Sequence, residues 1–197
     1  MILFARFISL IFNPTVFFLI MPFMVVYRQT QSGAYALKWQ IFSFLFLFLG
    51  VFLFLIGRLK GAFSDEDVSK REERYRLYIM AYFLAFIYLM VSIFFKGISF
   101  PLSIISFGII IGILIFNLVN YRIKASIHMG VACAFVITTG VLYGWVFSLV
   151  TLWIIPLVFW ARIISKKHSI REAITGGILG IVITLITGLI GKQLYIH

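Results

Sequence analysis

Residues 161–180 read ARIISKKHSIREAITGGILG, a short charged segment that runs directly into a glycine-rich apolar one. The charged part holds Arg162, His168 and Glu172 at fixed spacing. Small residues continue at every fourth position behind it, and such a stripe is typical of a helix that packs closely against another helix in lipid. The stretch therefore predicts a membrane helix that begins at a polar surface.

The composition extends this prediction to the whole chain. Of its 197 residues, 63% are hydrophobic and only 12% are charged. A water-soluble domain needs more polar surface than this to cover its core. We therefore predict an all-α fold, a polytopic membrane helix bundle of six to seven transmembrane helices. We expect one integral membrane domain over residues 1–197, with two spans in 1–57, a polar loop in 58–76 and five spans in 77–197.

Apolar segments near the length of about 20 residues that crosses a bilayer can be marked along the chain. The first resembles a signal peptide, but it is long and lacks a small-residue cleavage site, so we expect it to be a retained span. Asn13 and Pro14 are expected to break it into two pieces, and Gly144 alone separates two later segments, which predicts a tight hairpin. The segments are Phe7–Tyr27, Trp39–Gly57, Leu77–Phe95, Phe100–Tyr121, Ile127–Tyr143, Trp145–Ala161 and Ala173–Gly191.

Counting these crossings places the N-terminus and the intervals 58–76, 122–126 and 162–171 on one side, which we call face B. It collects thirteen of the seventeen Lys and Arg residues and all six acidic residues, with Glu172 directly after the last interval. The positive-inside rule predicts that face B is cytoplasmic, in a prokaryotic inner or plasma membrane.

The net charge of +11 comes from cations in short loops beside apolar segments. There they meet anionic lipid or phosphate groups, so we expect membrane lipids and no nucleic acid as partners. The single cysteine, Cys133, excludes an intramolecular disulfide and a zinc cluster.

Three polar clusters lie on face B. In the first, Arg71 and Arg74 are three residues apart, so both can lie on one side of a helix and act as phosphate clamps. The same charge run is also compatible with a solvated loop. In the second, Lys124, Ser126 and His128 alternate with apolar residues, which would aim them in the same direction in an extended segment.

Ionisable residues at the edge of a membrane helix, such as these, tend to line a cavity or substrate path. Lys124 could also simply be a positive charge that sets the topology.

In the third cluster, His168 and Glu172 are four residues apart and can meet on one helical face. A carboxylate on one imidazole nitrogen raises the nucleophilicity of the other. The alternative for this pair is a surface salt bridge in a turn. Behind it, Gly176, Gly180, Thr184 and Gly188 predict close helix packing.

Taken together, these residues resemble the phosphatidic acid phosphatase type 2 superfamily of membrane phosphatases, over about the last eighty residues of the chain. The third motif of that family reads Ser-Arg-x5-His-x3-Asp, and Arg162, His168 and Glu172 match its spacing. The second motif reads Pro-Ser-Gly-His, and Ser126 and His128 lie where its Ser and His stand, one helical hairpin upstream.

The resemblance implies a lipid phosphate or isoprenoid (di)phosphate phosphatase that needs no metal or other cofactor. His168 would be the nucleophile, Glu172 would orient it, and His128 would protonate the leaving oxygen. The residues expected to bind phosphate are Arg162, Ser126, Lys124, Arg122, Arg71 and Arg74.

The chain departs from the family motifs at several positions. Ala161 replaces the Ser of the third motif, Glu172 replaces its Asp, and Ala125 and Ile127 replace the Pro and Gly of the second. The first motif, Lys-x6-Arg-Pro, is absent as written, so its cations would come from Lys124, Arg122 or the Arg71 and Arg74 pair. The family also usually works on the extracytoplasmic face, in conflict with the charge count.

Two other interpretations stay open at this point. One is a catalytically degenerate lipid-phosphate-binding or transport protein. The other takes His128, His168 and Glu172 as metal ligands.

Overall fold

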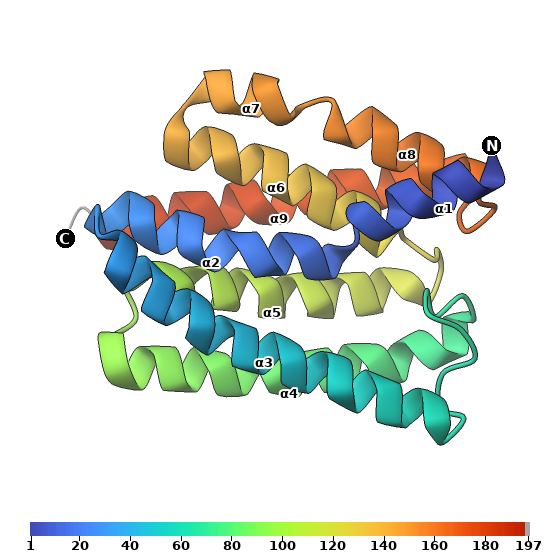
Figure 1. Ribbon diagram of the computed structural model, residues 1–197, viewed down its shortest axis with the longest axis horizontal. Coiled ribbons are helices and arrows are strands. Elements are labelled where there is room, and N and C mark those ends of the chain that lie inside the picture. The colour runs from blue at the N-terminus through green and yellow to red at the C-terminus, as the bar shows by residue number, and fades with distance from the viewer. Residues whose placement is uncertain (196–197) are drawn as a thin grey trace.

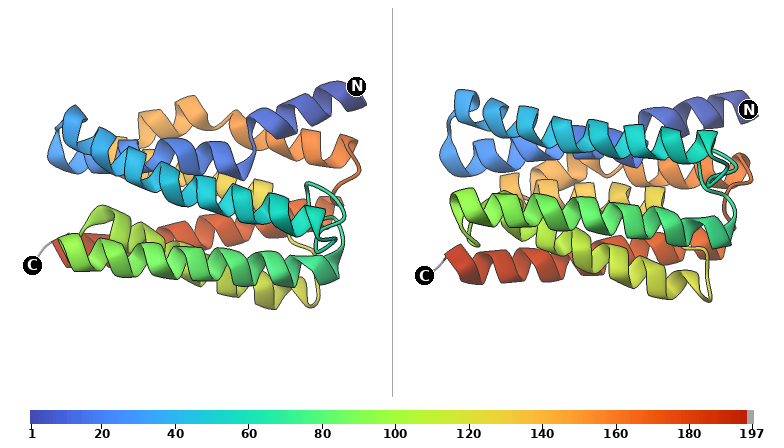
Figure 2. Two further views of the ribbon diagram at one scale, coloured as in Figure 1. Left: turned by 60° about the horizontal axis from the view of Figure 1, so that its bottom comes forward. Right: turned by 90° about the horizontal axis from the view of Figure 1, so that it is seen from below.

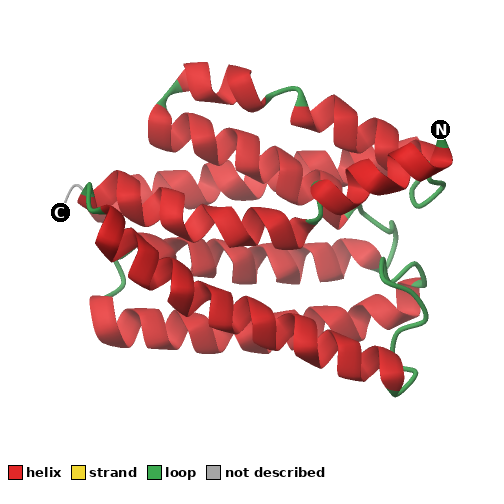
Figure 3. Cartoon of the chain, viewed as in Figure 1, coloured by secondary structure: helices red, strands yellow, loops and turns green. Residues whose placement is uncertain are grey.

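The computed structural model describes residues 1–195, which form helices and loops without a strand (Figures 1 and 3). Two pairs of consecutive helices, α1 with α2 and α7 with α8, each make up one broken rod. The helices within these residues are α1 (Ile2–Ile11), α2 (Pro14–Thr30), α3 (Gly33–Leu59), α4 (Arg71–Lys96), α5 (Pro101–Asn120), α6 (Ile127–Tyr143), α7 (Trp145–Thr151), α8 (Ile154–Ile164) and α9 (Ile170–Tyr195).

Six of these rods are long and apolar enough to cross a membrane: α1 with α2, α3, α4, α5, α7 with α8, and α9. The remaining helix, α6, has 17 residues and is apolar but shorter. The predicted all-α, polytopic membrane fold with six to seven spans is confirmed.

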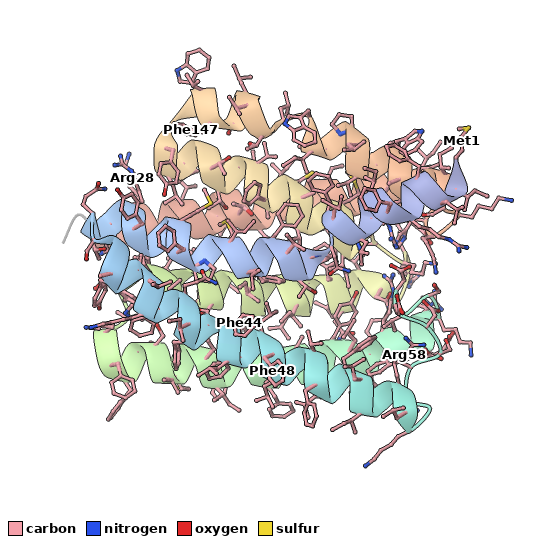
Figure 4. The ribbon with its side chains drawn as sticks, viewed as in Figure 1. Met1, Arg28, Phe44, Phe48, Arg58 and Phe147 are labelled. Carbon is pink, nitrogen blue, oxygen red and sulfur yellow. The ribbon has the colours of Figure 1, made fainter. Side chains whose placement is uncertain are left out.

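Large apolar side chains cover the outside of the bundle, as expected for a surface that faces lipid. Phe44 and Phe48 on α3 and Phe147 on α7 point away from it and are 49%, 62% and 51% exposed (Figure 4). The labelled arginines lie at its ends instead, Arg28 at one and Arg58 at the other. Apolar sides and charged ends are what a bilayer imposes on a spanning bundle.

The first rod breaks where the sequence predicted. Asn13 is the N-cap of α2, its Oδ1 accepts a hydrogen bond from the backbone N–H of Thr15 at 3.0 Å, and Pro14 takes the first helical position. A proline there costs nothing because its missing N–H would have no partner in the helix. The preceding helix, α1, packs on α8 through Ala5, Ile8 and Ala161.

The predicted sixth segment, Trp145–Ala161, is confirmed as part of a candidate span over Trp145–Ile164, although the span is not one continuous helix. It consists of α7 and α8, which meet at Leu152 and Trp153. Pro156 explains the break, because it has no N–H to donate to the carbonyl of Leu152 and its ring clashes with that carbonyl in a regular helix. The hairpin before α7 is confirmed, and Gly144 makes its turn with φ of 98°.

The closest helix packing in the bundle joins α6 and α9. A Cβ on Gly176 would collide with the backbone of Ser126, and a Cβ on Gly180 with the backbone of Gly130. At Gly188 the nearest atoms to such a Cβ are the methyl groups of Val141, at 3.9 and 4.0 Å. Close helix packing is therefore confirmed at Gly176 and Gly180, the first two glycines of the predicted stripe. At Gly188 an added Cβ would fit without a clash.

A polar side chain from α3 hydrogen-bonds to the backbone of α2 next to Pro22, which lies inside that helix. The side-chain amide of Gln40 on α3 accepts from the backbone N–H of Phe23 at 2.9 Å and donates to the backbone carbonyl of Leu19. In an unbroken helix these two backbone groups would bond to each other. Gln40 therefore contacts both groups and ties α3 to α2 across the membrane-spanning region.

We expect Gln40→Met, which keeps the side-chain length, to lower the free energy of unfolding by about 1 to 2 kcal/mol, because both backbone groups lose the hydrogen bond to Gln40 in a low-dielectric environment. Thermal unfolding in detergent measures the loss. The matched control is Gln29→Met, at an exposed position near the end of α2. Equal melting temperatures for the two variants would contradict the bridging role of Gln40.

The loops of face B gather at one end of the bundle. Figures 1 and 2 show the N-terminus, the α3–α4 loop, the α5–α6 loop and the α8–α9 loop at the same end, with the C-terminus at the other. The order of crossings predicted from the sequence is confirmed, and the three polar clusters come together.

Candidate functional site

Two hydrogen bonds and an ion pair join the three loops of face B. Ser126, in the α5–α6 loop, donates its backbone N–H to the carbonyl of Glu172 on α9 at 3.0 Å. Arg74 on α4 donates from its guanidinium to the carbonyl of Ala125 at 2.9 Å. Arg162 at the end of α8 pairs with Asp67 in the α3–α4 loop at 3.0 Å. Segments that are far apart in the sequence thus form one polar centre.

Two arginines are almost fully buried in this centre, although arginine is rarely buried unless it is paired. Arg74 is 3% exposed and Arg162 is 2% exposed. The Nε of Arg74 donates to the carbonyl of Val68 at 3.1 Å. The Nε of Arg162 is buried and finds no hydrogen-bond partner within residues 1–195. This leaves a buried donor available for a ligand oxygen.

An acidic loop supplies the counter-charge, and sequence reasoning missed it. Asp67 contacts Arg162 through Oδ1 and Lys167 through Oδ2, at 3.0 and 3.1 Å. Burial would raise the pKa of Asp67, but the charges of Arg162 and Lys167 outweigh burial and lower it. Asp67 is therefore ionised at neutral pH. The only signal in the sequence was the Asp-x-Asp spacing inside a run of charges, which is a common feature of solvated loops.

His168 lies just before α9 and is 7% exposed. Its backbone N–H reaches back to the carbonyl of Arg162 at 3.4 Å, which holds the ring beside the end of α8. Burial, followed by the charges of Arg74, Arg162 and Lys124, lowers the pKa of His168 to about 2. These effects outweigh the nearby carboxylate of Glu172, so the imidazole is neutral at physiological pH.

The contact between His168 and Glu172 exists, but its geometry differs from the expected one. Nδ1 of His168 lies 3.3 Å from Oε2 of Glu172. His168 is not on the helix, and its Nδ1 makes no hydrogen bond within the described residues. Glu172 instead accepts from the backbone N–H of Ser169 at 2.9 Å, while its own N–H donates to the Ser169 hydroxyl at 3.3 Å.

This reciprocal pair is a capping box, in which a Ser and a Glu three residues later satisfy the free N–H groups at the start of a helix. Glu172 thus caps α9 and faces His168 at the same time. The interpretation as a surface salt bridge is not supported, because a neutral, buried imidazole carries no charge to pair.

We expect the ring of His168 to stay neutral between pH 5 and 8, because its pKa of about 2 lies far below the ordinary value of 6.5. Below pH 6.5 the ring binds a proton in the unfolded chain but not in the folded chain. The free energy of unfolding therefore falls as the pH drops below that value. NMR of histidine-labelled protein measures the titration, and the His168→Ala spectrum identifies the signal. A midpoint near 6.5 would contradict the burial of this ring.

Ser126 and His128 both lie at the start of α6. Ser126 is 0% exposed and is the N-cap of the helix, with its hydroxyl accepting from the N–H of Met129 at 3.4 Å. His128 is half-buried and close enough to Asp67 and His168 to influence the pKa of both. His128 therefore belongs to the centre, while the hydroxyl of Ser126 already serves the helix cap.

The other predicted phosphate-binding residues line a separate outer pocket of about 370 Å³. Arg71, Arg122 and Lys124 contribute cations to it, and Arg171, which the sequence analysis did not single out, contributes a fourth. The lining residues are Ser69, Arg71, Arg122, Ile123, Lys124, Ser169, Arg171 and Glu172. Because Glu172 borders this pocket and also contacts His168, the pocket adjoins the buried centre.

The six predicted phosphate ligands thus separate into an inner and an outer group. Arg74, Arg162 and Ser126 are buried, whereas Arg71 and Arg122 are exposed. Lys124 joins the two groups, because it lines the outer pocket, hydrogen-bonds to the carbonyl of Ser69 at 3.4 Å and acts on the pKa of His168. Arg71 and Arg74 are three residues apart but do not act as one clamp, because their side chains lie in different environments.

The metal-site interpretation is not supported by the geometry. Within residues 1–195, no group of three or more His, Cys, Asp or Glu side chains is placed to hold a metal ion, so His128, His168 and Glu172 do not form such a set. Comparisons of the chain with models of protein families, with curated proteins and with solved structures gave no match. The site combines two buried arginines and a neutral histidine at one end of a polytopic membrane protein.

Proposed function

We propose that this protein is an integral membrane phosphatase that hydrolyses a lipid phosphate or an isoprenoid (di)phosphate through a phosphohistidine intermediate. The observation that carries the proposal is the burial of Arg74 and Arg162 beside the neutral ring of His168. Buried guanidinium groups are suited to phosphate oxygens, and a neutral imidazole is a nucleophile. The site lies at helix ends, so a head group could enter it while the tail remains in the bilayer.

In the proposed reaction, His168 attacks the phosphorus atom. Since its Nδ1 faces Glu172, the attacking atom is Nε2. A nitrogen–phosphorus bond forms, the bond from phosphorus to the leaving oxygen breaks, and His128 gives that oxygen a proton. Water then attacks the phosphorus atom and gives a proton to His128 as the nitrogen–phosphorus bond breaks, which releases phosphate and restores both histidines.

The buried cations stabilise charge on the phosphate oxygens during both steps. Arg162 offers its free Nε, and Arg74 and Lys124 add positive charge around His168. Arg71 and Arg122 in the outer pocket would attract the anionic head group toward the centre. Each step uses only side chains, so the scheme needs no metal or other cofactor.

The proposal places the chain as a divergent member of the phosphatidic acid phosphatase type 2 superfamily, on the strength of the spacing of Arg162, His168 and Glu172. It also places face B on the cytoplasmic side of a prokaryotic inner or plasma membrane, on the strength of the cations gathered there. Accessibility of a cysteine introduced at Glu66 to a membrane-impermeant thiol reagent, in intact cells and in inverted vesicles, tests the orientation.

The activity is tested with purified protein in detergent by phosphate release from phosphatidate and from an isoprenoid diphosphate, each with excess chelator. We expect release from at least one substrate, at a rate that chelator does not change. Heat-denatured protein is the control. Absence of release from both lipids, or release that chelator abolishes, would overturn the proposal.

A second candidate function is a catalytically degenerate protein that binds or transports a lipid phosphate. It is favoured by Ser126, whose hydroxyl is engaged in the cap of α6, and by His168, whose Nδ1 has no hydrogen bond from or to Glu172 among the described residues. This candidate predicts saturable binding of the anionic lipid without product, even over long incubation.

A further inference from the structure

The carboxylate of Asp67 lies in the position that an anionic ligand of this centre would take. Its two oxygens contact different cations, Oδ1 the buried Arg162 at 3.0 Å and Oδ2 Lys167 at 3.1 Å. Two phosphate oxygens would make the same kind of contact, because guanidinium and ammonium groups bind carboxylate and phosphate alike. The centre therefore carries an anion of its own.

The loop around Asp67, residues 65–69, is built to hold this carboxylate in place, and we call it the strap. Asp65 accepts hydrogen bonds from the backbone N–H groups of Asp67 and Ser69, at 2.9 and 3.1 Å, and from the Ser69 hydroxyl at 3.0 Å. A second, weaker ion pair joins Asp65 to Lys167 at 3.8 Å. The strap thus has its own internal order. It is attached to the centre through its acidic groups, and also through the carbonyls of Val68 and Ser69 and the Ser69 hydroxyl.

Backbone strain marks the strap as an element held down by its contacts. Val68 has a φ of 48°, a left-handed conformation that β-branched residues rarely adopt. It is 1% exposed, and its carbonyl accepts the Nε hydrogen bond of Arg74 at 3.1 Å. Strain of this kind persists only where surrounding contacts enforce it, so loss of the Asp67 contacts would favour release of the strap.

We propose that Asp67 is the internal anion of the site and sets its affinity for phosphate: a phosphate group binds by exchanging with the Asp67 carboxylate, which leaves Arg162 and Lys167 together with the strap. A buried arginine without a counter-charge is costly, so the cations require one anion or the other. The inference rests on the proposed function only in that the incoming anion is a phosphate group.

The first test compares Asp67→Asn with Glu66→Gln, which removes the same charge one residue away from an exposed side chain (84%). Inorganic phosphate is the probe, and its dissociation constant is measured by calorimetry on the detergent-solubilised full chain. We expect the Asp67→Asn variant to bind phosphate about tenfold more tightly than the unaltered chain, because the competing charge is gone while the amide still accepts from Arg162. The Glu66→Gln variant is expected to match the unaltered chain.

The same variants separate competition from simple positioning in the lipid phosphatase assay. Competition predicts that Asp67→Asn lowers KM and leaves kcat within about twofold, since uniform binding of substrate improves without a change in the chemical step. A positioning role alone predicts weaker phosphate binding and a lower kcat. Unchanged or weaker phosphate binding by Asp67→Asn would overturn the proposal.

A second measurement follows the strap itself and does not require activity. The thiol of a Val68→Cys variant reports release of the strap, because Val68 is buried and the native Cys133 is buried inside the bundle. We expect saturating inorganic phosphate to raise the rate of thiol labelling several-fold, and the double variant with Asp67→Asn to be labelled rapidly without phosphate. If phosphate binds but the rate of thiol labelling stays the same, the exchange is overturned.

The outcomes for this inference and for the proposed function can be told apart. Phosphate binding that opens the strap, without any hydrolysis of lipid phosphates, supports the exchange and overturns the phosphatase. Hydrolysis with no effect of Asp67→Asn on phosphate affinity supports the phosphatase and overturns the exchange. Failure of phosphate to bind to either the unaltered chain or Asp67→Asn overturns the exchange, and release from the lipid substrates then decides the phosphatase by itself.

Discussion

Replacing His168 with alanine is expected to lower kcat for phosphate release by about a thousandfold or more, because the variant lacks the atom that accepts the phosphoryl group. The buried ring contributes to packing, yet the bundle rests on apolar contacts of its long helices, so the variant should remain folded. Phosphate release and thermal unfolding, measured on the same preparation, separate loss of chemistry from loss of structure.

The matched control for this variant is Lys166→Asn. Lys166 lies two residues before His168 in the same loop, is exposed and has a φ of 55°, a conformation that asparagine tolerates. We expect this control to keep the turnover of the unaltered protein. A phosphoprotein that is stable to base and labile to acid should form with the control and be missing with His168→Ala. Unchanged turnover in His168→Ala would contradict the proposed mechanism.

Replacing Gly180 with alanine is expected to destabilise the bundle by about 3 kcal/mol, at the upper end of the usual cost of overpacking a core. The added Cβ would fall on the backbone of Gly130, which cannot rotate away as a flexible side chain can. The two helices would have to separate along their closest line of contact. Thermal or denaturant-induced unfolding in detergent measures the effect.

Gly188→Ala is the matched control, because it adds the same methyl group to the same helix. Its Cβ would meet only the methyl groups of Val141, at ordinary contact distances of 3.9 and 4.0 Å. We expect this variant to unfold at the temperature of the unaltered protein or slightly above, since alanine favours helix over glycine. If both variants unfold at the same temperature, close packing at Gly180 contributes nothing.

The packing of α6 on α9 also positions the candidate site. Gly176 lies against Ser126, whose backbone N–H bonds to the carbonyl of Glu172 at 3.0 Å. The start of α6, which carries His128, is therefore held directly against the segment that carries His168. This link explains why a glycine stripe follows the charged segment: the close approach brings His128, at the start of α6, toward His168, which lies just before α9.

Much of the fold could be predicted because membrane insertion depends on local properties of the chain. Each apolar segment identifies its own span, and Asn13, Pro14 and Gly144 are turn or capping residues whose effect is local. The break between α7 and α8 was missed because the apolar run continues through it. Pro156 was the available signal, but a proline inside an apolar run is compatible with either a tolerated kink or a new helix.

The candidate site was predictable only in part. The order of crossings places His128, His168 and Arg162 at the same end of the bundle, and spacing brings Glu172 close to His168. The separation of Arg71 from Arg74 could not be foreseen, because helical spacing says which side chains share a face and not which neighbour covers them. Burial of Arg74 results from the carbonyls of Val68 and Ala125, which belong to two other segments.

By itself, therefore, the sequence determined that this protein is a polytopic membrane bundle with its reactive residues at one end, since hydropathy and crossing order are properties of the linear chain. Only the tertiary structure decided which cations are buried and that Asp67 occupies the space between Arg162 and Lys167. These features depend on long-range contacts between loops, where burial converts ordinary surface charges into paired, desolvated groups. The chemistry proposed for the site rests on that conversion.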